Sequence, residues 1–202
     1  MKITKIEVQK KNKNRVNLYL NNAFNCGLSL EVVVKYGLKE GKELNQELLD
    51  FLCDSSEKEV AMNKAISYIA RYQKTEKEIQ EYLLKKGFED EIIQEVIKKL
   101  KEYNFIDDDL FAQNYIKYKT RSVGKRKLAY ELRKKGIKET LIDNNIDIYS
   151  QDSDNVLLVA EKYLRNKPRD IKTKQKTYRY LLSRGFISED IIRALNKIFK
   201  EE

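Results

Sequence analysis

Three consecutive carboxylates, Asp107, Asp108 and Asp109, are the residues whose type and spacing come nearest to a catalytic site. Carboxylate oxygens are the ligands that Mg²⁺ prefers, so the cluster could belong to a metal-dependent nuclease. Adjacent acids at a helix start point in different directions, however, and such acids are typically caps. The chain also contains no histidine, which removes the commonest general base and metal ligand. We therefore expect no catalytic residues, no metal site and no cofactor, and keep a nuclease only as a third hypothesis.

Two other features contain residue types that occur in active sites, but we interpret both as structural. Cys26 and Cys53 are too few and too scattered for a disulfide framework or a zinc site, and we interpret them as buried free thiols in a reducing cytosol. The pair Gly124-Lys125 is not a phosphate-binding loop, because Lys119 and Arg126 stand where that motif needs Gly and Ser or Thr. Neither feature predicts an enzyme.

Positive charge is concentrated in two segments of the chain. Residues 117–138 contain ten basic side chains and one acid, Glu131, while residues 162–184 contain nine basic side chains and one acid, Asp170. The segments carry local charges of +9 and +8 in a chain of net charge +9, so the remainder carries −8. A solvated Lys-rich surface would scatter its charges, whereas this segregation favours a surface for an anionic partner.

We predict a binding surface made of residues from both segments. Its members are Lys117, Lys119, Arg121, Lys125, Arg126, Lys127, Arg133, Lys134, Lys135, Arg165, Lys167, Arg169, Lys172, Lys174, Lys176, Arg179 and Arg184. Tyrosines are interleaved with these cations at Tyr118, Tyr130, Tyr178 and Tyr180, a combination typical of nucleic-acid binding, although core packing would explain most of them equally well.

A thrice-repeated motif positions these segments. The pattern Leu-x-x-x-Gly-apolar begins at Leu83, Leu132 and Leu181, so that its glycines are 49 residues apart. A period of this length indicates a repeat architecture, and each glycine is expected to end a helix in the left-handed conformation. Both basic segments fall at the same place in their repeats, from the end of the first helix to the second. Regular stacking of the repeats would therefore join the two segments into one stripe.

Helical periodicity governs the chain from residue 55 onward. Ser56 with Glu59, and Thr75 with Glu78, have the spacing of capping boxes and predict two helix starts in the first repeat. Ala65, Ala112 and Ala160 each precede a tyrosine by three residues, a spacing that we interpret as packing. We predict a three-helix repeat in each of residues 55–106, 107–152 and 153–202.

Residues 1–54 follow a different pattern. Apolar residues alternate with polar ones up to about Leu28, which predicts a three-stranded antiparallel meander. Ser29 and Asn45 can each cap a following helix. The predicted fold class is therefore mainly α: three tandem three-helix repeats in an elongated array, whose curvature the sequence leaves open, after a small strand-rich α+β module. No apolar run approaches the length of a membrane helix, and we expect a soluble cytoplasmic protein without membrane contact.

The second repeat carries a family resemblance. The segment Phe105-Ile106-Asp107-Asp108-Asp109-Leu110-Phe111-Ala112, followed by Arg121-x-x-Gly124-x-x-x-Leu128-x-x-Glu131-Leu132-x-x-Lys135-Gly136-Ile137, resembles the signature of the RecX family of bacterial regulatory proteins. The first repeat agrees, with Arg71, Thr75, Glu78-Ile79 and Lys86-Gly87-Phe88 in the expected order. The resemblance covers about residues 61–202.

The resemblance implies a cytoplasmic modulator of the RecA recombinase. Members of this family bind the RecA filament on DNA and typically suppress its ATPase, strand-exchange and coprotease activities, and several also bind DNA. We accordingly expect a monomer whose partners are the RecA filament and single- or double-stranded DNA. A helical-repeat protein that binds DNA without RecA is the alternative hypothesis. We expect the N-terminal module to cap the first repeat.

Overall fold

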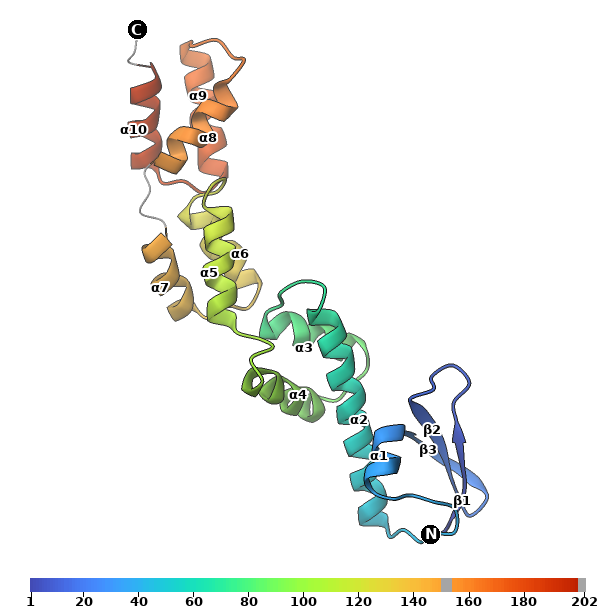
Figure 1. Ribbon diagram of the computed structural model, residues 1–202. Helices are drawn as coiled ribbons and strands as arrows, with labels where there is room; N and C mark the ends of the chain where they lie inside the picture. Colours follow the sequence, from blue (N-terminus) through green and yellow to red (C-terminus); the bar gives the residue numbers. More distant parts are fainter. Residues whose placement is uncertain (150–153, 200–202) are drawn as a thin grey trace. The chain divides into compact units, whose positions relative to one another are not determined.

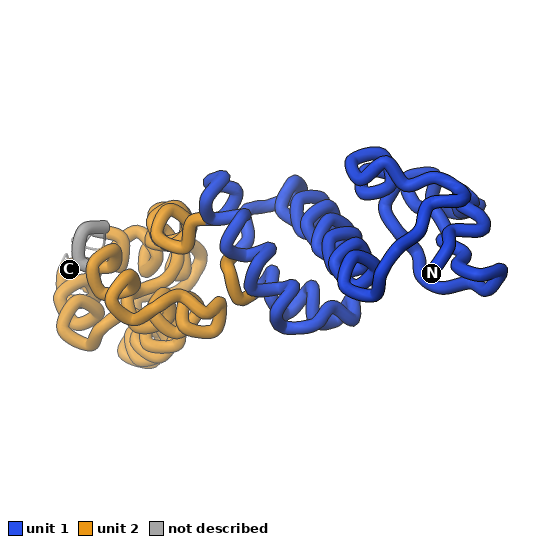
Figure 2. The backbone as a smooth tube through the Cα atoms, turned by 90° about the horizontal axis from the view of Figure 1, so that it is seen from below, with its two compact units in different colours: residues 1–74, 78–106 blue, residues 75–77, 107–202 orange. Residues whose placement is uncertain are grey.

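The computed structural model describes residues 1–149 and 154–199, and its ribbon is shown in Figure 1. Backbone contacts divide the chain into two compact units, residues 1–74 with 78–106 and residues 75–77 with 107–202 (Figure 2). The short segment 75–77, the first turn of a helix in the first repeat, thus belongs to the second unit. No helix in the described ranges is long and apolar enough to cross a bilayer.

The first unit opens with the predicted antiparallel meander. Strands β1 (Ile3–Val8), β2 (Arg15–Leu20) and β3 (Ala23–Ser29) are paired in the order β1-β2-β3. Asn21 and Asn22 make the second turn in the left-handed conformation, which asparagine tolerates better than most residues. One face of the sheet carries buried apolar side chains that pack with the helices that follow, so that the meander is not isolated.

Two helices complete the module. Helix α1 (Leu30–Lys35) is capped by Ser29, whose Oγ accepts a hydrogen bond from the Val32 amide at 3.1 Å. Helix α2 (Gln46–Ile69) is capped by Asn45, whose Oδ1 accepts from the Leu48 amide at 2.8 Å. Both predicted caps are confirmed.

The expected helix start at Ser56 is wrong. Ser56 lies inside the 24-residue helix α2 and is buried, and its Oγ accepts a hydrogen bond from the Ser29 amide at 2.6 Å. Ser29 in turn donates its hydroxyl to Glu59. The predicted division between residues 54 and 55 therefore falls within one continuous helix.

The remaining helices form the three repeats. The first repeat adds α3 (Glu76–Lys85) and α4 (Asp90–Glu102) to the second half of α2. The second contains α5 (Asp108–Lys119), α6 (Lys125–Lys134) and α7 (Glu139–Tyr149), and the third contains α8 (Asp154–Leu164), α9 (Ile171–Ser183) and α10 (Ser188–Phe199). Within the described residues, each repeat has its own cluster of buried apolar side chains, and the sheet module has another. The predicted fold class, three three-helix repeats after a small antiparallel sheet, is confirmed. The predicted boundary between residues 152 and 153 lies outside the described ranges.

The three motif glycines end helices in one common geometry. Gly87, Gly136 and Gly185 all have φ of +85°. In each case the amide of the residue after the glycine donates to the carbonyl of the motif leucine, as in Phe88 to Leu83 at 3.3 Å. The amide of the glycine itself donates to the carbonyl of the residue that follows the leucine. This is the Schellman pattern, which satisfies carbonyls that the helix leaves without partners.

Candidate nucleic-acid interface

The three adjacent carboxylates are each held by different partners. Asp107 caps α5, its Oδ1 accepting from the amides of Asp109 and Leu110 at 2.9 and 3.0 Å. Asp108 accepts from the Glu76 amide at 2.9 Å, and Asp109 accepts from the side-chain amide of Asn145 at 2.6 Å. The carboxylates therefore diverge, and among the residues that the structure describes no three acids, cysteines or histidines converge as metal ligands.

The predicted cations are all accessible. Of the seventeen, twelve are exposed, five are half-buried and none is buried. All belong to the second compact unit. They lie at the ends of α5 and α8, in the connections after these two helices, and in or directly after helices α6 and α9. The half-buried members are Lys119, Lys127, Lys135, Lys174 and Arg184.

Arg133, one of the predicted cations, is paired with an acid. The Arg133 guanidinium donates to the Glu139 carboxylate through Nε at 2.7 Å and also through its terminal nitrogen. This hydrogen-bonded pairing raises the pKa of Arg133 and lowers the pKa of Glu139. Arg133 is therefore less available to an external anion than an unpaired guanidinium would be, because its donors already hold a carboxylate.

Backbone contacts join the two basic segments. The Gly124 amide, at the start of α6, donates to the Arg184 carbonyl at 2.9 Å, and the Arg126 amide donates to the Gly185 carbonyl at 3.1 Å. Backbone amides that have no intrahelical partner at the start of one helix thus donate to backbone carbonyls that have none at the end of another. A Cβ on Gly124 would overlap the Gly185 carbonyl. The contact places Arg184 of the second segment directly beside the three consecutive cations Lys125, Arg126 and Lys127 of the first.

The same joint occurs one repeat earlier. The Thr75 hydroxyl donates to the Lys135 carbonyl at 2.7 Å, and Lys77 Nζ donates to the Lys134 carbonyl at 3.3 Å. Thr75 stands 49 residues before Gly124, and Lys135 stands 49 residues before Arg184. The Leu-x-x-x-Gly motif therefore acts twice as a docking turn for the second helix of the preceding repeat.

Aromatic rings lie beneath several cations. In the third repeat Tyr163 and Tyr180 stack with centroids 4.2 Å apart, with Lys167 Nζ 3.0 Å from the first ring centroid and the Arg184 guanidinium 5.1 Å from the second. In the first repeat Tyr68 and Tyr82 stack at the same distance, with Lys74 and Lys86 over the rings. These cation–π contacts hold the cations close to the helices.

The second repeat replaces the stacked pair by a hydrogen bond. Glu131 stands at the position of Tyr82 and Tyr180, and it accepts the Tyr115 hydroxyl at 2.6 Å. Lys119 and Lys135 lie 5.6 and 5.8 Å from the centre of the Tyr115 ring. The single acid of the first basic segment is thus an internal partner of Tyr115. The sequence interpretation of these repeated tyrosines as packing residues missed the cations above them.

The four interleaved tyrosines divide into two classes. Tyr118 and Tyr130 are 78% and 65% exposed and are accessible to a partner. Tyr178 and Tyr180 are half-buried and pack against the apolar cluster of the third repeat. Bases of single-stranded nucleic acid can stack on exposed aromatic rings that lie among cations. The first basic segment therefore offers rings for stacking and cations for phosphates.

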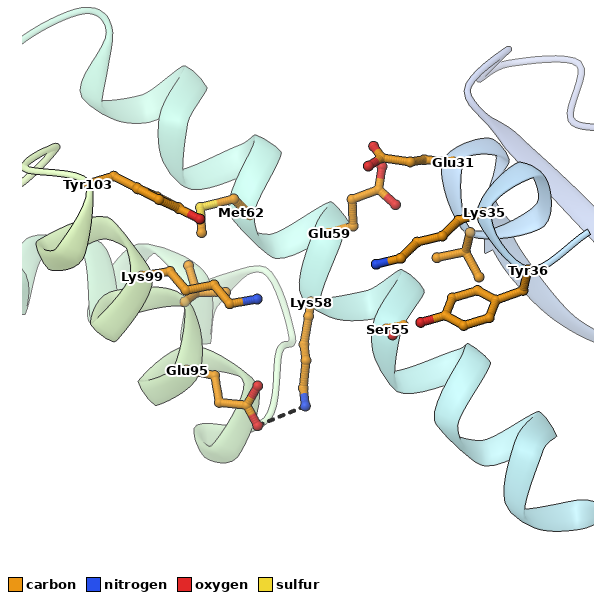
Figure 3. A pocket seen from close by; sticks show the side chains of 12 residues that line it. Glu31, Lys35, Tyr36, Ser55, Lys58, Glu59, Met62, Glu95, Lys99 and Tyr103 are labelled. Carbon is orange, nitrogen blue, oxygen red and sulfur yellow. Dashed lines mark hydrogen bonds and ion pairs between the residues drawn. The ribbon is translucent and has the colours of Figure 1, made fainter.

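The first unit contains a cavity of a different character. It measures about 290 Å³ and lies between α1, α2 and α4 (Figure 3). Its lysines alternate with acids, and Lys58 Nζ is paired with Glu95 at 2.7 Å. Burial raises the pKa of Glu59, which also lines the cavity. The mixture of charges gives this cavity no preference for an anionic partner, in contrast to the surface of the second unit.

Four family models match the chain in consecutive order. They are described as the regulatory protein RecX N-terminal domain, at residues 1–45, and the first, second and third three-helix domains of RecX, at residues 61–100, 107–144 and 151–195. The models cover more than half of the chain and assign one domain to the module and one to each repeat.

Individual relatives agree with the family models. Regulatory protein RecX of Clostridium tetani is 37% identical over 203 residues, covering 98% of this chain and 94% of that protein. Its counterpart in Staphylococcus aureus is 34% identical over 203 residues, covering 98% and 74%. A crystal structure of regulatory protein RecX superposes with a TM-score of 0.71 at 26% identity, covering 100% of this chain and 99% of that one. RecX from Lactobacillus salivarius has the same fold, with a TM-score of 0.63 at 22% identity, over 71% and 97% of the two chains.

Proposed function

Because the chain belongs to the RecX family of regulatory proteins, we propose that it is a non-enzymatic regulator of the RecA recombinase. In this proposal it binds RecA filaments on DNA and lowers their ATPase, strand-exchange and coprotease activities. It acts as a monomer in the cytoplasm, within DNA repair and the SOS response. The observation that carries the proposal is the consecutive match of four family models, one to the N-terminal module and one to each repeat.

The charge distribution supports a nucleoprotein partner. A filament on DNA presents phosphates, and a surface of accessible cations gains affinity from them by releasing condensed counterions. The joint between Gly124 and Arg184 makes the two basic segments neighbours, so that one partner can meet cations from both. We propose the seventeen cations as this surface, with the contribution of Arg133 reduced because it holds Glu139.

The proposal also assigns a role to each domain of the chain. We propose residues 1–54 as a module that covers the end of the first repeat, since α2 continues from one into the other. Residues 55–106, 107–152 and 153–202 are proposed as the three repeats. The second and third repeats carry the binding surface.

A titration of RecA activity tests the proposal. RecA is assembled on single-stranded DNA, ATP hydrolysis is followed, and the protein is added up to several-fold excess over RecA. We expect hydrolysis to fall as the protein is added. An unchanged rate at the highest excess would contradict a RecA-directed function.

The alternative function is DNA binding without RecA. It is favoured by the exposed rings of Tyr118 and Tyr130 among the cations of the first basic segment. In that case affinity for naked DNA is substantial, and replacing Lys125, Arg126 and Lys127 by glutamate abolishes DNA binding. A RecA-directed protein retains part of its filament binding after the same replacement, so the two functions give different results with one variant.

A further inference from the structure

Cys26 and Cys53 meet in the first unit although 27 residues separate them. Cys26 lies on β3 and Cys53 on α2, and their Sγ atoms are 3.0 Å apart. Both thiols are free and half-buried, at the edge of the apolar cluster that β3 and α2 share. The expectation of free thiols is confirmed, but the expectation that the two cysteines are scattered and buried is wrong. They form a close pair of residues that are only half-buried.

The surroundings of the pair differ on its two sides. The guanidinium of Arg15 lies on the β3 side, where it donates to the Gly27 carbonyl at 2.9 Å and favours a negative charge on Cys26. Asp50, Asp54 and Glu57 lie around Cys53 on α2 and oppose a negative charge there.

The hydrogen bond between the sulfurs has a larger effect than these charges. A thiolate at Cys53 is stabilised by the remaining proton on Cys26, which lowers the pKa of Cys53 and raises the pKa of Cys26. The thiolate is the form that attacks oxidants, and the second thiol is already in contact with it.

We propose that Cys26 and Cys53 form a thiol–disulfide redox site, in which a hydroperoxide oxidises the pair to a bond between β3 and α2. The Cys53 thiolate attacks the peroxide oxygen, giving a sulfenic acid, and the expelled hydroxide takes up the proton that the Cys53 thiol has lost. Cys26 sulfur then attacks the sulfenic sulfur and displaces hydroxide, which leaves as water with the Cys26 proton. Two thiols and one hydrogen peroxide thus become one disulfide and two waters.

The geometry favours closure within the chain. The sulfurs must approach by only about 1 Å to reach bonding distance. Because the second thiol already lies within hydrogen-bonding distance of the first, it reaches the sulfenic acid before a thiol of another molecule does. The bond would fasten the first half of α2 to the sheet, so that the unfolding of the N-terminal module would require more force or heat.

Oxidation of the reduced full-length chain tests the proposal. The chain is treated with hydrogen peroxide, the oxidant is removed, and free thiols are counted in denaturant while the intact mass is measured. We expect the thiol count to fall from two to zero, the mass to fall by two hydrogen atoms, and the chain to remain a monomer on a non-reducing gel. Dithiothreitol should restore both thiols.

Single variants separate the two roles. In Cys26→Ser oxidation should stop at a sulfenic acid that dimedone traps, whereas in Cys53→Ser reaction with peroxide should slow. A double Cys26→Ser/Cys53→Ser variant gives the matched control, since peroxide should raise the melting temperature of the natural chain only. Thiols that survive peroxide, disulfides between chains, or an equal melting shift in the double variant would each overturn the proposal.

Discussion

Gly124 and Gly185 face each other at a distance that excludes a side chain on either residue. A Cβ on Gly124 would overlap the Gly185 carbonyl, and a Cβ on Gly185 would overlap the Lys127 backbone amide. The two glycines come from different repeats, at a helix start and a helix end. Their contact forms the joint at which the two basic segments become adjacent.

The joint predicts unequal costs for alanine at equivalent glycines. Gly87→Ala places a side chain at φ +85° with no atom within 4 Å, so it should cost about 1 kcal/mol of left-handed strain. Gly185→Ala has the same φ and also a backbone overlap, so it should cost a further 1–3 kcal/mol, roughly. Urea unfolding followed by circular dichroism measures both variants. Equal losses of stability would show that the joint contributes nothing.

Reversing three cations at the start of α6 should weaken binding without weakening the fold. Glutamates at Lys125, Arg126 and Lys127 occupy the first turn of a helix, where acids are favoured, so melting should change little. Affinity for DNA should fall at least about tenfold at low salt. The slope of log affinity against log salt should become shallower by about 0.9 for each duplex phosphate that the variant no longer neutralises.

A control variant carries the same change in total charge. Lys39, Lys64 and Lys98 are exposed residues of the first unit, and their replacement by glutamate also removes six charge units. This variant should keep most of its affinity, because its charges lie outside the proposed surface. Equal losses in the two variants would indicate that net charge alone, rather than this surface, determines binding.

Glu131 should limit the affinity of the first basic segment. Glu131→Gln removes the only acid of the first basic segment, so the affinity of the protein for DNA should rise and become more salt-dependent. The same change weakens the hydrogen bond from Tyr115 and should cost about 1 kcal/mol of stability. Tyr115→Phe is the matched control, because it removes the hydrogen bond but leaves the charge in place. If Tyr115→Phe raised affinity as much, the gain would come from loosened structure instead.

Glu59 should make the first unit more stable in acid. Burial is the main cause that raises its pKa, the neighbouring Glu31 adds to it, and the hydrogen bond from Ser29 opposes it. The folded chain therefore binds this proton more tightly than the unfolded chain does. That contribution to stability is complete below the unfolded pKa and is lost as pH rises through the folded pKa.

Glu59→Gln tests this pH dependence. The amide is uncharged at every pH and can still accept the Ser29 hydroxyl, so the variant should melt at a higher temperature than the natural chain near neutral pH. The difference should shrink at pH about 4, where the natural carboxyl is largely protonated. Glu57→Gln, an exposed neighbour on α2, controls for the change of net charge. A pH-independent difference would mean that Glu59 does not titrate as its burial implies.

Local signals in the sequence predicted much of the fold. The Leu-x-x-x-Gly motif identified all three Schellman turns, because a left-handed residue after a helix is a local requirement that glycine meets. The same signals failed at Ser56. The spacing of Ser56 and Glu59 is that of a cap, but both side chains serve Ser29, a residue brought close only by the tertiary fold.

The candidate site was predictable in composition but not in arrangement. Counting charges identified the two basic segments, since charge is a property of the chain itself. The pairing of Arg133 with Glu139, the role of Glu131 beside Tyr115, and the meeting of Gly124 with Gly185 depend on helix packing. The contact between Cys26 and Cys53 depends on it as well, because a separation of 27 residues does not fix a distance in space.

The continuous helix α2 contributes buried residues to two cores, so its helical turn fixes the direction in which each set of residues points relative to the other. Leu49 and Leu52 are buried in the sheet module, while Ala61 and Ala65 are buried in the first repeat. One helical residue advances the chain by about 1.5 Å and turns it by about 100°. A single insertion between Leu52 and Ala61 would therefore turn one core away from its partners while leaving the identity of every core residue unchanged. The number of residues in this segment is consequently as constrained as their identity.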